Sequence, residues 1–397
     1  MPRTVSVAIL LTAGLLTGLA YPAISADQTV YQMADGVVRP SRFRGAKEAY
    51  LPIIAPTSHA SNLLALPNGD LLCVWYTGTG ERDRGVSIAM SRLDSGSSRW
   101  TLPIIISNHP GWANQNPVLF SAPDGRLWLF HDSQKHGSSE ATAIVDELTS
   151  DDHGRTWTAP RPLFTQHGFY LRQPLVVFHQ KWLFPIYQEE SGGVSSAAAR
   201  NDYSIVEISQ GSGKAWSGCT VPGSGGIVQM NIIKPFGGPL LAFFRSRFAD
   251  WIYESKSEDG CSWTIPIRTS LPNNNASIQA VRLNDGHIVM AFNNAQASTM
   301  RGRPGAASRE VLSVALSIDN GKTWPWVRDV QAGNEPPPFR PCEDPEYSYP
   351  SVVQSPDGMI ELTFTFRRET IKYMTFDEQW IKRGATVGVQ RGDEAIY

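Results

Sequence analysis

The sequence predicts an all-β protein, a six-bladed β-propeller, and three observations lead to this fold class. A short turn motif recurs along the chain at a spacing typical of propeller blades. Six segments read as apolar strand, tight turn and apolar strand, which is the pattern of a β-hairpin. Helical periodicity is nearly absent from the 397 residues. Six hairpins, each followed by further strand-like sequence, give six four-stranded blades.

The recurring motif has the pattern S-x-D-x-G-x-T-W. Two segments match it fully, 150–157 (SDDHGRTW) and 317–324 (SIDNGKTW). Three degraded copies lie at 209–216 (SQGSGKAW), 256–263 (KSEDGCSW) and 91–100 (SRLDSGSSRW). The tryptophans recur at roughly 50 to 60 residues, a period in the propeller range. We interpret the motif as a turn in which the aspartate accepts turn amides, the glycine allows positive φ and the tryptophan buries its ring.

The six hairpin segments are 61–76, 116–132, 174–188, 231–245, 278–294 and 350–366. Four of them carry an N-G or D-G turn, the strongest local hairpin signal. The polar stretch 27–55 precedes the first hairpin, and we expect it to supply the strand that closes the ring beside the C-terminal segment.

The N-terminus reads as a secretory signal, so we divide the chain into a signal peptide, 1–26, and a single propeller domain, 27–397. Arg3 gives a positive start, 5–20 is apolar, and small residues allow cleavage after Ala26. A short membrane anchor is the alternative, but the apolar run is shorter than the roughly 20 residues that span a bilayer. We expect a secreted or periplasmic protein with no membrane span in its mature form.

The formal net charge is −2, from 35 basic and 37 acidic side chains, which gives no global electrostatic case for a nucleic-acid partner. None of the four cysteines forms a C-x-x-C pair, so the sequence predicts neither a metal site nor an organic cofactor. Export would permit disulfides, and Cys219 and Cys261 could pair; buried free thiols are the alternative.

The predicted innermost strands all begin with polar side chains, which at equivalent places would line a central funnel. These are His59 and Ser61; Asn114, Gln115 and Asn116; Arg172 and Gln173; Gln229 and Asn231; Ser277 and Gln279; and Tyr347 and Tyr349. Amides and hydroxyls suit sugar hydroxyls, so we expect a glycan or polysaccharide substrate. A wet channel with structural hydrogen bonds is the alternative.

The second strands also end with polar groups, among them Arg245, Arg247, Arg367 and Arg368. An arginine at such a place could bind a carboxylate through two parallel hydrogen bonds, although a surface salt bridge explains any single one equally well. Two loops, 295–308 and 329–345, are long enough to shape a binding site.

These residues resemble the sialidase (neuraminidase) superfamily, and more closely its bacterial branch of predicted neuraminidases with aspartate-box (BNR) repeats. The resemblance covers nearly the whole mature chain. It implies a sialidase-like propeller in which three arginines bind a substrate carboxylate, a tyrosine activated by a glutamate is the nucleophile, and an aspartic acid is the acid/base. A neutral tyrosine avoids repulsion from the carboxylate on the anomeric carbon, and sialidases stand apart from the two-carboxylate scheme of other glycosidases.

Three segments match the family's pattern. FFRSR is similar to the segment of the second arginine and implies Arg245, REVLSVALSIDNG implies Arg309 for the third, and EYSYPS implies Tyr347 as the nucleophile.

Three segments depart from the pattern. SHASNL replaces the R-I-P segment and puts His59 near the first arginine's place. Gln229 stands at about the place of the family's activating glutamate. The segment at the place of the acid/base loop reads YTGTGERDRG, which offers Glu81 and Asp83.

The expected function is that of an exported, sialidase-like exo-glycosidase that removes a terminal acidic sugar. The candidate catalytic residues are Tyr347, Glu81, Asp83 and His59. If the enzyme hydrolyses another terminal sugar, Glu81, Asp83 or Glu346 would supply the carboxylates. The candidate substrate-binding residues are Arg245, Arg309, Arg172, Gln229, Asn116, Gln279 and Tyr349. One alternative is a lyase that acts on a uronate, with His59 or a tyrosine as base beside an arginine. The other is a non-catalytic carbohydrate-binding propeller.

Overall fold

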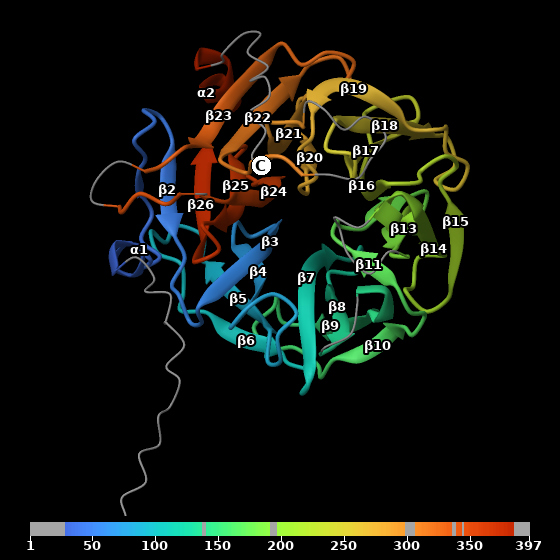
Figure 1. Cartoon of the computed structure of the whole chain (residues 1–397), viewed down its shortest axis with the longest axis horizontal. Helices are drawn as coiled ribbons and strands as arrows, with labels where there is room; N and C mark the ends of the chain where they lie inside the picture. Colours follow the sequence, from blue (N-terminus) through green and yellow to red (C-terminus); the bar gives the residue numbers. More distant parts are fainter. Residues whose placement is uncertain are drawn as a thin grey trace, which may run out of the picture.

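Six antiparallel sheets stand around a central axis in the computed structural model, which confirms the predicted propeller (Figure 1). The structure describes residues 28–136, 140–190, 197–297, 306–335, 339–343 and 345–384. The expected signal peptide and most of the loop 295–308 lie outside these residues.

The first three blades follow one another along the chain, each starting with its innermost strand. Blade 1 contains β3 (Thr57–Ala65), β4 (Leu71–Gly78), β5 (Ser87–Leu93) and β6 (Ile104–Ser107). Blade 2 contains β7 (Trp112–Ser121), β8 (Leu127–Lys135), β9 (Ile144–Ser150) and β10 (Arg161–Phe164). Blade 3 contains β11 (Phe169–Leu171), β12 (Val176–Phe178), β13 (Lys181–Gln188), β14 (Tyr203–Ser209) and β15 (Trp216–Thr220). In blade 3 the innermost position is shared by β11 and β12, since both pair with β13.

The last three blades complete the ring. Blade 4 contains β16 (Ile227–Ile233), β17 (Leu240–Ser246), β18 (Trp251–Ser257) and β19 (Ile267–Pro272). Blade 5 contains β20 (Gln279–Arg282), β21 (Ile288–Asn293), β22 (Val311–Ser317) and β23 (Trp326–Ala332). Blade 6 contains β24 (Tyr347–Gln354), β25 (Ile360–Phe366) and β26 (Thr370–Phe376), joined by β1 (Arg39–Pro40) and β2 (Lys47–Tyr50).

The N-terminal segment closes the ring, as the sequence predicts. Strand β2 pairs antiparallel with β26, with Ala49 opposite Tyr373. The outer part of blade 6 therefore comes from the start of the chain and its inner strands from the end. This pairing ties the two ends of the described chain together, and β24 and β25 of blade 6 contact β3 of blade 1.

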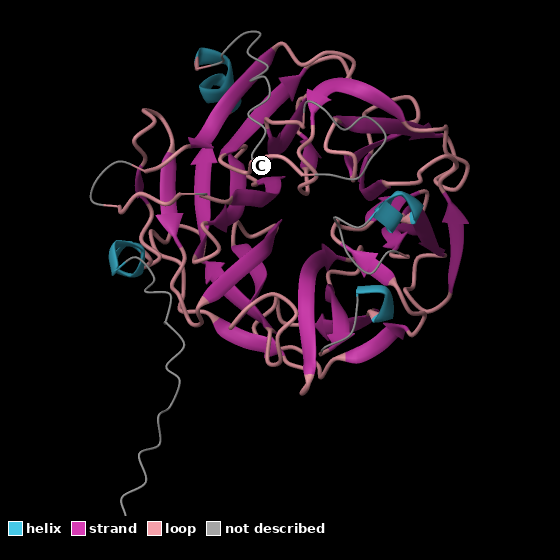
Figure 2. Cartoon of the chain, in the orientation of Figure 1, coloured by secondary structure: helices cyan, strands magenta, loops and turns pink. Residues whose placement is uncertain are grey.

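Helix is scarce among the described residues (Figure 2). The helices α1 (Gln28–Met33) and α2 (Glu378–Arg383) lie at the outer edge of the ring, whereas the 3-10 turns η1 (Glu140–Thr142) and η2 (Ala197–Asn201) belong to connections within blades 2 and 3. Asp377 caps α2 by accepting the Trp380 amide, as N-cap aspartates do. No helix in the described ranges is long and apolar enough to cross a membrane.

The core lies between neighbouring blades, where aromatic side chains from adjacent sheets meet. Phe130 of blade 2 and Phe184 of blade 3 have ring centroids 4.8 Å apart. Phe243 of blade 4 and Trp324 of blade 5 meet edge to face at 5.8 Å. Each such contact buries apolar surface that a single blade would leave exposed, so the blades are stable only as a ring.

The turns that carry the recurring motif form as expected. Asp152 Oδ1 accepts the amides of Arg155 and Thr156, and Asp319 Oδ1 accepts the amide of Thr323. Gly154 has φ +79°, and a Cβ there would come within 2.8 Å of the Leu72 side chain of the neighbouring blade. Glycine is therefore required both for the turn and for the close approach of two blades.

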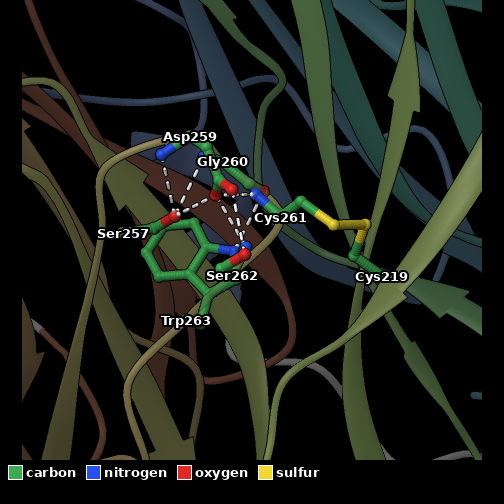
Figure 3. The surroundings of a disulfide bond; sticks show 7 residues. All are labelled: Cys219, Ser257, Asp259, Gly260, Cys261, Ser262 and Trp263. Atoms are coloured by element: carbon green, nitrogen blue, oxygen red, sulfur yellow. Dashed lines mark hydrogen bonds between the residues drawn. A yellow bond between two sulfur atoms is a disulfide. The ribbon is translucent and has the colours of Figure 1, made fainter.

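A disulfide joins blade 3 to blade 4, which settles the cysteine alternatives left open by the sequence. Cys219 on β15 bonds to Cys261 in the turn after β18, as Figure 3 shows. The same turn is fixed by Asp259, whose Oδ1 accepts the amides of Cys261 and Ser262. The bond thus attaches the outermost strand of one blade to a rigid turn of the next.

Candidate active site

A small cavity of about 120 Å³ lies on the propeller axis, and all six blades contribute to its wall. The described lining residues are Tyr76, Glu81, Arg82, Asn116, Glu140, Tyr170, Tyr187, Gln229, Arg245, Arg309, Tyr349 and Arg368. A space of this size suits one sugar unit rather than several.

The innermost strands aim side chains into this cavity through β-bulges. The register of the inner pair shifts in β3, β7, β16 and β24. At each shift a non-glycine residue has positive φ: Ala60 (56°), Asn116 (46°), Gln229 (54°) and Tyr349 (53°). Such conformations cost on the order of 1–3 kcal/mol each and concentrate at functional sites.

Two of these bulges have a visible cause in the sequence. Proline follows Asn116 and Tyr349 directly, and proline has no amide hydrogen to give to the ladder. Within a sheet, proline is therefore confined to edges and bulges. The bulges turn Asn116, Gln229 and Tyr349 into the cavity.

Arg172 fixes the bulges of β3 and β24 and does not line the cavity. From the break between β11 and β12, its Nη2 donates to the carbonyl oxygens of Ser61 (3.0 Å), Tyr349 (3.0 Å) and Pro350 (3.1 Å). Burial lowers the pKa of Arg172 to about 10, so the side chain keeps its charge at neutral pH. Arg172 therefore binds main-chain carbonyl groups and does not face the cavity, in contrast to the substrate-binding position that the sequence led us to expect.

Two tyrosines two residues apart have different environments, and this changes the candidate nucleophile. The Tyr347 hydroxyl donates to the Gly333 carbonyl oxygen, and its ring packs on Phe366, 5.2 Å away, outside the cavity. Tyr349 lines the cavity, and its hydroxyl accepts from Arg245 Nη1 at 2.8 Å. Only Tyr349 faces the cavity, so it replaces Tyr347 as the candidate nucleophile.

Cations surround the Tyr349 ring. The guanidinium carbons of Arg245 and Arg309 lie 5.7 Å and 5.5 Å from its centroid, within the range of cation–π attraction. Burial alone would raise the pKa of Tyr349, but the charges of Arg245 and Arg309 outweigh it and place this pKa below the usual tyrosine value. The phenolate is thus more accessible here than in water.

Arg368 supplies a third cation, which the sequence indicated only as one of several strand-end arginines. It lies in the tight turn between β25 and β26, where Arg367 and Arg368 both have positive φ, 54° and 57°. Such a turn ordinarily contains asparagine or glycine, so two arginines in it are strained. Arg368 Nε pairs with Glu346 at 2.7 Å and Nη1 with Glu81 at 2.7 Å.

Glu346 lies behind the cavity and links two of these arginines. Its Oε1 is 2.6 Å from Arg309 Nη1, and its Oε2 pairs with Arg368. Burial opposes ionisation, but Arg309 and Arg368 together hold the pKa of Glu346 far below its usual value. Glu346 is therefore a permanent carboxylate that orients the cations, which makes it unsuitable as a proton donor.

This pairing predicts a pH dependence of stability. Because folding lowers the pKa of Glu346, its ion pairs stabilise the fold fully above the usual glutamate value of 4.5 and progressively less as the pH falls below it. We expect Glu346→Gln to show a flatter fall in unfolding free energy between about pH 7 and about pH 3, measured by urea denaturation. Glu207→Gln is the control, because burial raises the pKa of Glu207 and its removal should not flatten the curve. Equal slopes for wild type and Glu346→Gln would contradict the assignment.

His59 is buried beside the cavity rather than in it. Its ring centroid is 4.3 Å from that of Tyr349, and its Nδ1 hydrogen-bonds the Thr365 hydroxyl at 2.8 Å. Burial, followed by the charge of Arg368, lowers the pKa of His59 well below its usual value. His59 is thus a neutral side chain that supports Tyr349, and Arg368 supplies the charge near the place where the resemblance puts an arginine.

The remaining sequence candidates divide into two groups. Glu81, Gln229 and Asn116 line the cavity as expected. Asp83 does not line it, and its Oδ2 accepts the Thr79 hydroxyl at 3.1 Å within the same loop. Gln279 Oε1 accepts the Val352 amide at 2.6 Å, so it ties blade 5 to blade 6 near the other end of the axis.

Three buried polar atoms on the cavity wall have no hydrogen-bond partner among the described residues: the Tyr76 hydroxyl, Arg245 Nη2 and Gln229 Oε1. An unsatisfied buried donor on an arginine costs more than one on a neutral group. A ligand with an anionic oxygen beside a hydroxyl would satisfy Arg245 Nη2 and Gln229 Oε1.

Among the described residues, one cluster outside the cavity has metal-ligating chemistry. Asp285, His287 and Glu378 bring ligand atoms within 4.8 Å of one another at the rim, beside α2. Lys382 already pairs with Glu378, so a cation would compete with an ammonium group there. We assign it no role in the cavity.

Comparison with known proteins agrees with this architecture. A family model described as a BNR repeat-like domain matches residues 69–362. No curated protein sequence matches the chain.

Solved structures of similar fold include two sialidases and a trans-sialidase. A Hadza microbial sialidase aligns with a TM-score of 0.64 at 15% identity, over 82% of this chain and 67% of that one. The NanB sialidase from Streptococcus pneumoniae gives 0.64 at 13%, over 84% and 71%. The intramolecular trans-sialidase from Ruminococcus gnavus gives 0.63 at 14%, over 84% and 97%. Likeness at this level of identity establishes a common fold, and the chemistry has to be argued from the cavity.

Proposed function

Because the chain belongs to the BNR repeat-like domain family and carries a sialidase-like propeller, we propose that it is an exo-acting glycoside hydrolase that removes a terminal sugar bearing a carboxylate. One observation carries the proposal: Arg245, Arg309 and Arg368 line the same cavity as Tyr349. The small volume of the cavity favours attack on a chain end rather than within a chain.

The charged groups are arranged in a consistent order around the ring. Blades 4, 5 and 6 supply the three arginines, while blades 1 and 2 supply Glu81 and Glu140. A bound sugar would direct its carboxylate towards blades 4–6, where guanidinium groups can pair with it. Its glycosidic oxygen would then face blades 1 and 2, where a carboxyl group can exchange a proton with it.

The proposed reaction has two halves. Tyr349 attacks the anomeric carbon as the phenolate that the neighbouring arginines stabilise, and the glycosidic bond breaks with its electron pair on the leaving oxygen, which takes a proton from a carboxyl group of the cavity. Water then attacks the same carbon, its proton returns to that carboxylate, and the electron pair of the sugar–Oη bond returns to Tyr349. Gln229 cannot act as a base, so the cations rather than a glutamate activate the tyrosine.

A second candidate is β-elimination from a terminal uronate. The contact of His59 with Tyr349 favours it, because a tyrosine base beside arginines that neutralise the carboxylate is what elimination needs. Against it, the wall holds two acidic groups, Glu81 and Glu140, for which elimination has less use.

The test is product analysis. Purified mature protein would be incubated with sialosides, other acidic terminal glycosides and uronate polysaccharides, and the products followed by mass spectrometry. An intact acidic monosaccharide supports the hydrolase, and an unsaturated uronate supports the lyase. Absence of any product, with retained binding of the acidic sugar, would contradict both and favour a carbohydrate-binding module.

The role of Arg368 gives a separate prediction. Arg368→Gln removes a charge-assisted contact to the substrate carboxylate, so KM for the acidic substrate should rise about 100-fold. A matched substrate in which a neutral group replaces the carboxylate should react equally slowly with both proteins. Arg367→Gln is the control, because Arg367 in the same turn pairs with Glu369 and does not line the cavity. A larger loss for Arg367→Gln than for Arg368→Gln would contradict the assignment.

We also propose that the protein is exported. The disulfide between Cys219 and Cys261 supports this, because structural disulfides persist in oxidising compartments.

A further inference from the structure

Glu140 is a cavity carboxyl that neither the sequence pattern nor the family resemblance indicates. It opens the 3-10 turn η1 between β8 and β9 of blade 2, and its side chain is almost fully buried in the cavity wall. Its Oε1 pairs with Arg82 Nη2 at 2.6 Å. The two residues come from different blades, so this contact connects the 79–86 loop of blade 1 to blade 2.

The backbone of that loop is strained at Arg82, the residue that contacts Glu140. Arg82 has φ 69°, in the left-handed region that glycine favours, and Gly85 follows at φ 80°. The Arg82 carbonyl oxygen lies 3.3 Å from His136 Nδ1, a second contact with blade 2. Strain of this kind persists only where surrounding contacts impose it, and it concentrates at functional sites.

The other acid of the cavity wall is already engaged. Glu81 is more exposed than Glu140 and pairs with Arg368 on the cationic side. Glu140 of blade 2 pairs with Arg82 of blade 1, whereas the three arginines come from blades 4, 5 and 6. Tyr170 and Tyr187 of blade 3 line the cavity with it, and their rings are 5.6 Å apart. Glu140 therefore lies in an aromatic, largely desolvated part of the wall.

A proton donor at neutral pH needs a carboxyl that resists ionisation. Burial raises the pKa of Glu140 above the usual glutamate value, although the charge of Arg82 opposes this. Glu346 shows the reverse, since its arginine partners lower its pKa. Two carboxyls whose environments move their pKa values apart are the pattern expected of a donor and an electrostatic partner.

We infer that Glu140, held in place by Arg82, is the acid/base of the proposed reaction: it protonates the leaving oxygen and then accepts a proton from the attacking water. This rests on the proposed function and deepens it, because it locates the leaving-group side of the cavity at blade 2. Arg82 is a positioning residue that keeps the carboxyl on the wall.

The test compares leaving groups. A glycoside with a nitrophenol leaving group departs without help from an acid, whereas a sugar leaving group needs the proton. Glu140→Gln should therefore lose about 100- to 10,000-fold in kcat/KM on the sugar-linked substrate and much less on the nitrophenyl glycoside. The basic limb of its pH–rate profile should also disappear, since that limb reports loss of the acid's proton.

The matched control is Glu147→Gln. Glu147 on β9 of the same blade also pairs with an arginine, Arg161, and burial raises its pKa, but it lies outside the cavity. We expect Glu147→Gln to keep wild-type rates on both substrates. Circular dichroism of both variants would verify that they fold.

The outcomes separate the inference from the proposed function. Activity of the wild type, with equal small effects of Glu140→Gln on both substrates, would overturn the inference and leave the hydrolase intact. A leaving-group effect in Glu81→Gln instead of Glu140→Gln would move the role to Glu81 and also overturn it. A wild type that releases no sugar from either substrate would overturn the hydrolase and the inference together.

Discussion

Tyr349→Phe should abolish turnover of the acidic glycoside and leave the fold intact. Loss of the nucleophilic oxygen removes the covalent step itself, and we expect kcat to fall at least about a thousandfold. The ring, which packs against His59 and lies among the arginines, is retained in phenylalanine. Binding of the substrate carboxylate should therefore survive, so KM should change little. Steady-state kinetics on one acidic substrate would measure both constants.

The matched control is Tyr347→Phe, which makes the same chemical change two residues away. Tyr347 donates to the Gly333 carbonyl oxygen, and losing that hydrogen bond costs about 1 kcal/mol of stability. Its rate should stay within about threefold of wild type, because the removed group does not face the cavity. If Tyr347→Phe were inactive and Tyr349→Phe active, the tyrosine assignment would be reversed.

Replacement of Cys219 and Cys261 by serine should lower the free energy of unfolding by about 4 kcal/mol, given the 42-residue separation that the bond closes. The bond joins two blades, so the reduced chain gains conformational freedom in its unfolded state that the native ring does not share. Activity at low temperature should persist, because neither cysteine lines the cavity. Urea unfolding of the double variant against wild type would measure the difference.

Cys342→Ser is the control for that variant, since Cys342 is a free cysteine. Its unfolding free energy should match wild type within about 0.5 kcal/mol. Wild type treated with a reductant should approach the double variant. A double variant as stable as wild type would show that the blades are held together without the bond.

The fold was accessible from the sequence because its signals are local. The N-G and D-G turns, the apolar strands that flank them and the S-x-D-x-G-x-T-W turns each lie within a few residues of the chain. Closure of the ring by the strand 47–50 could also be predicted, because the sixth blade needs a strand from the start of the chain.

The candidate site was accessible only in part. Arg245, Arg309, Glu81, Gln229 and Asn116 were placed correctly on the wall, since motif and strand position were sufficient for them. Tyr347 and Tyr349 could not be separated, because a regular strand would direct both to one face. The bulge between Ser348 and Ser351 separates them, and Pro350 was the signal that could have indicated it.

The positions of Arg368 and of the Arg82–Glu140 pair in the cavity wall could not be predicted, because no local sequence pattern encodes them. Arg368 lies in a tight turn that contains no glycine or asparagine, so turn chemistry does not indicate where its side chain points. Arg82 and Glu140 are 58 residues apart and meet only because blades 1 and 2 are neighbours. Their contact follows from the assembled ring rather than from either segment.

The covalent step at Tyr349 can be tested by trapping the intermediate and identifying the residue that carries the sugar. An acidic glycoside with an activated leaving group, and a fluorine beside the anomeric carbon to slow hydrolysis, would be incubated with wild type and with Tyr349→Phe. Intact-protein mass spectrometry and peptide mapping would then locate the added sugar. We expect one sugar on the peptide that contains Tyr349 and none on the variant. A sugar attached to Glu81 or Glu140, or steady turnover of an acidic glycoside with no adduct, would contradict the covalent step at Tyr349.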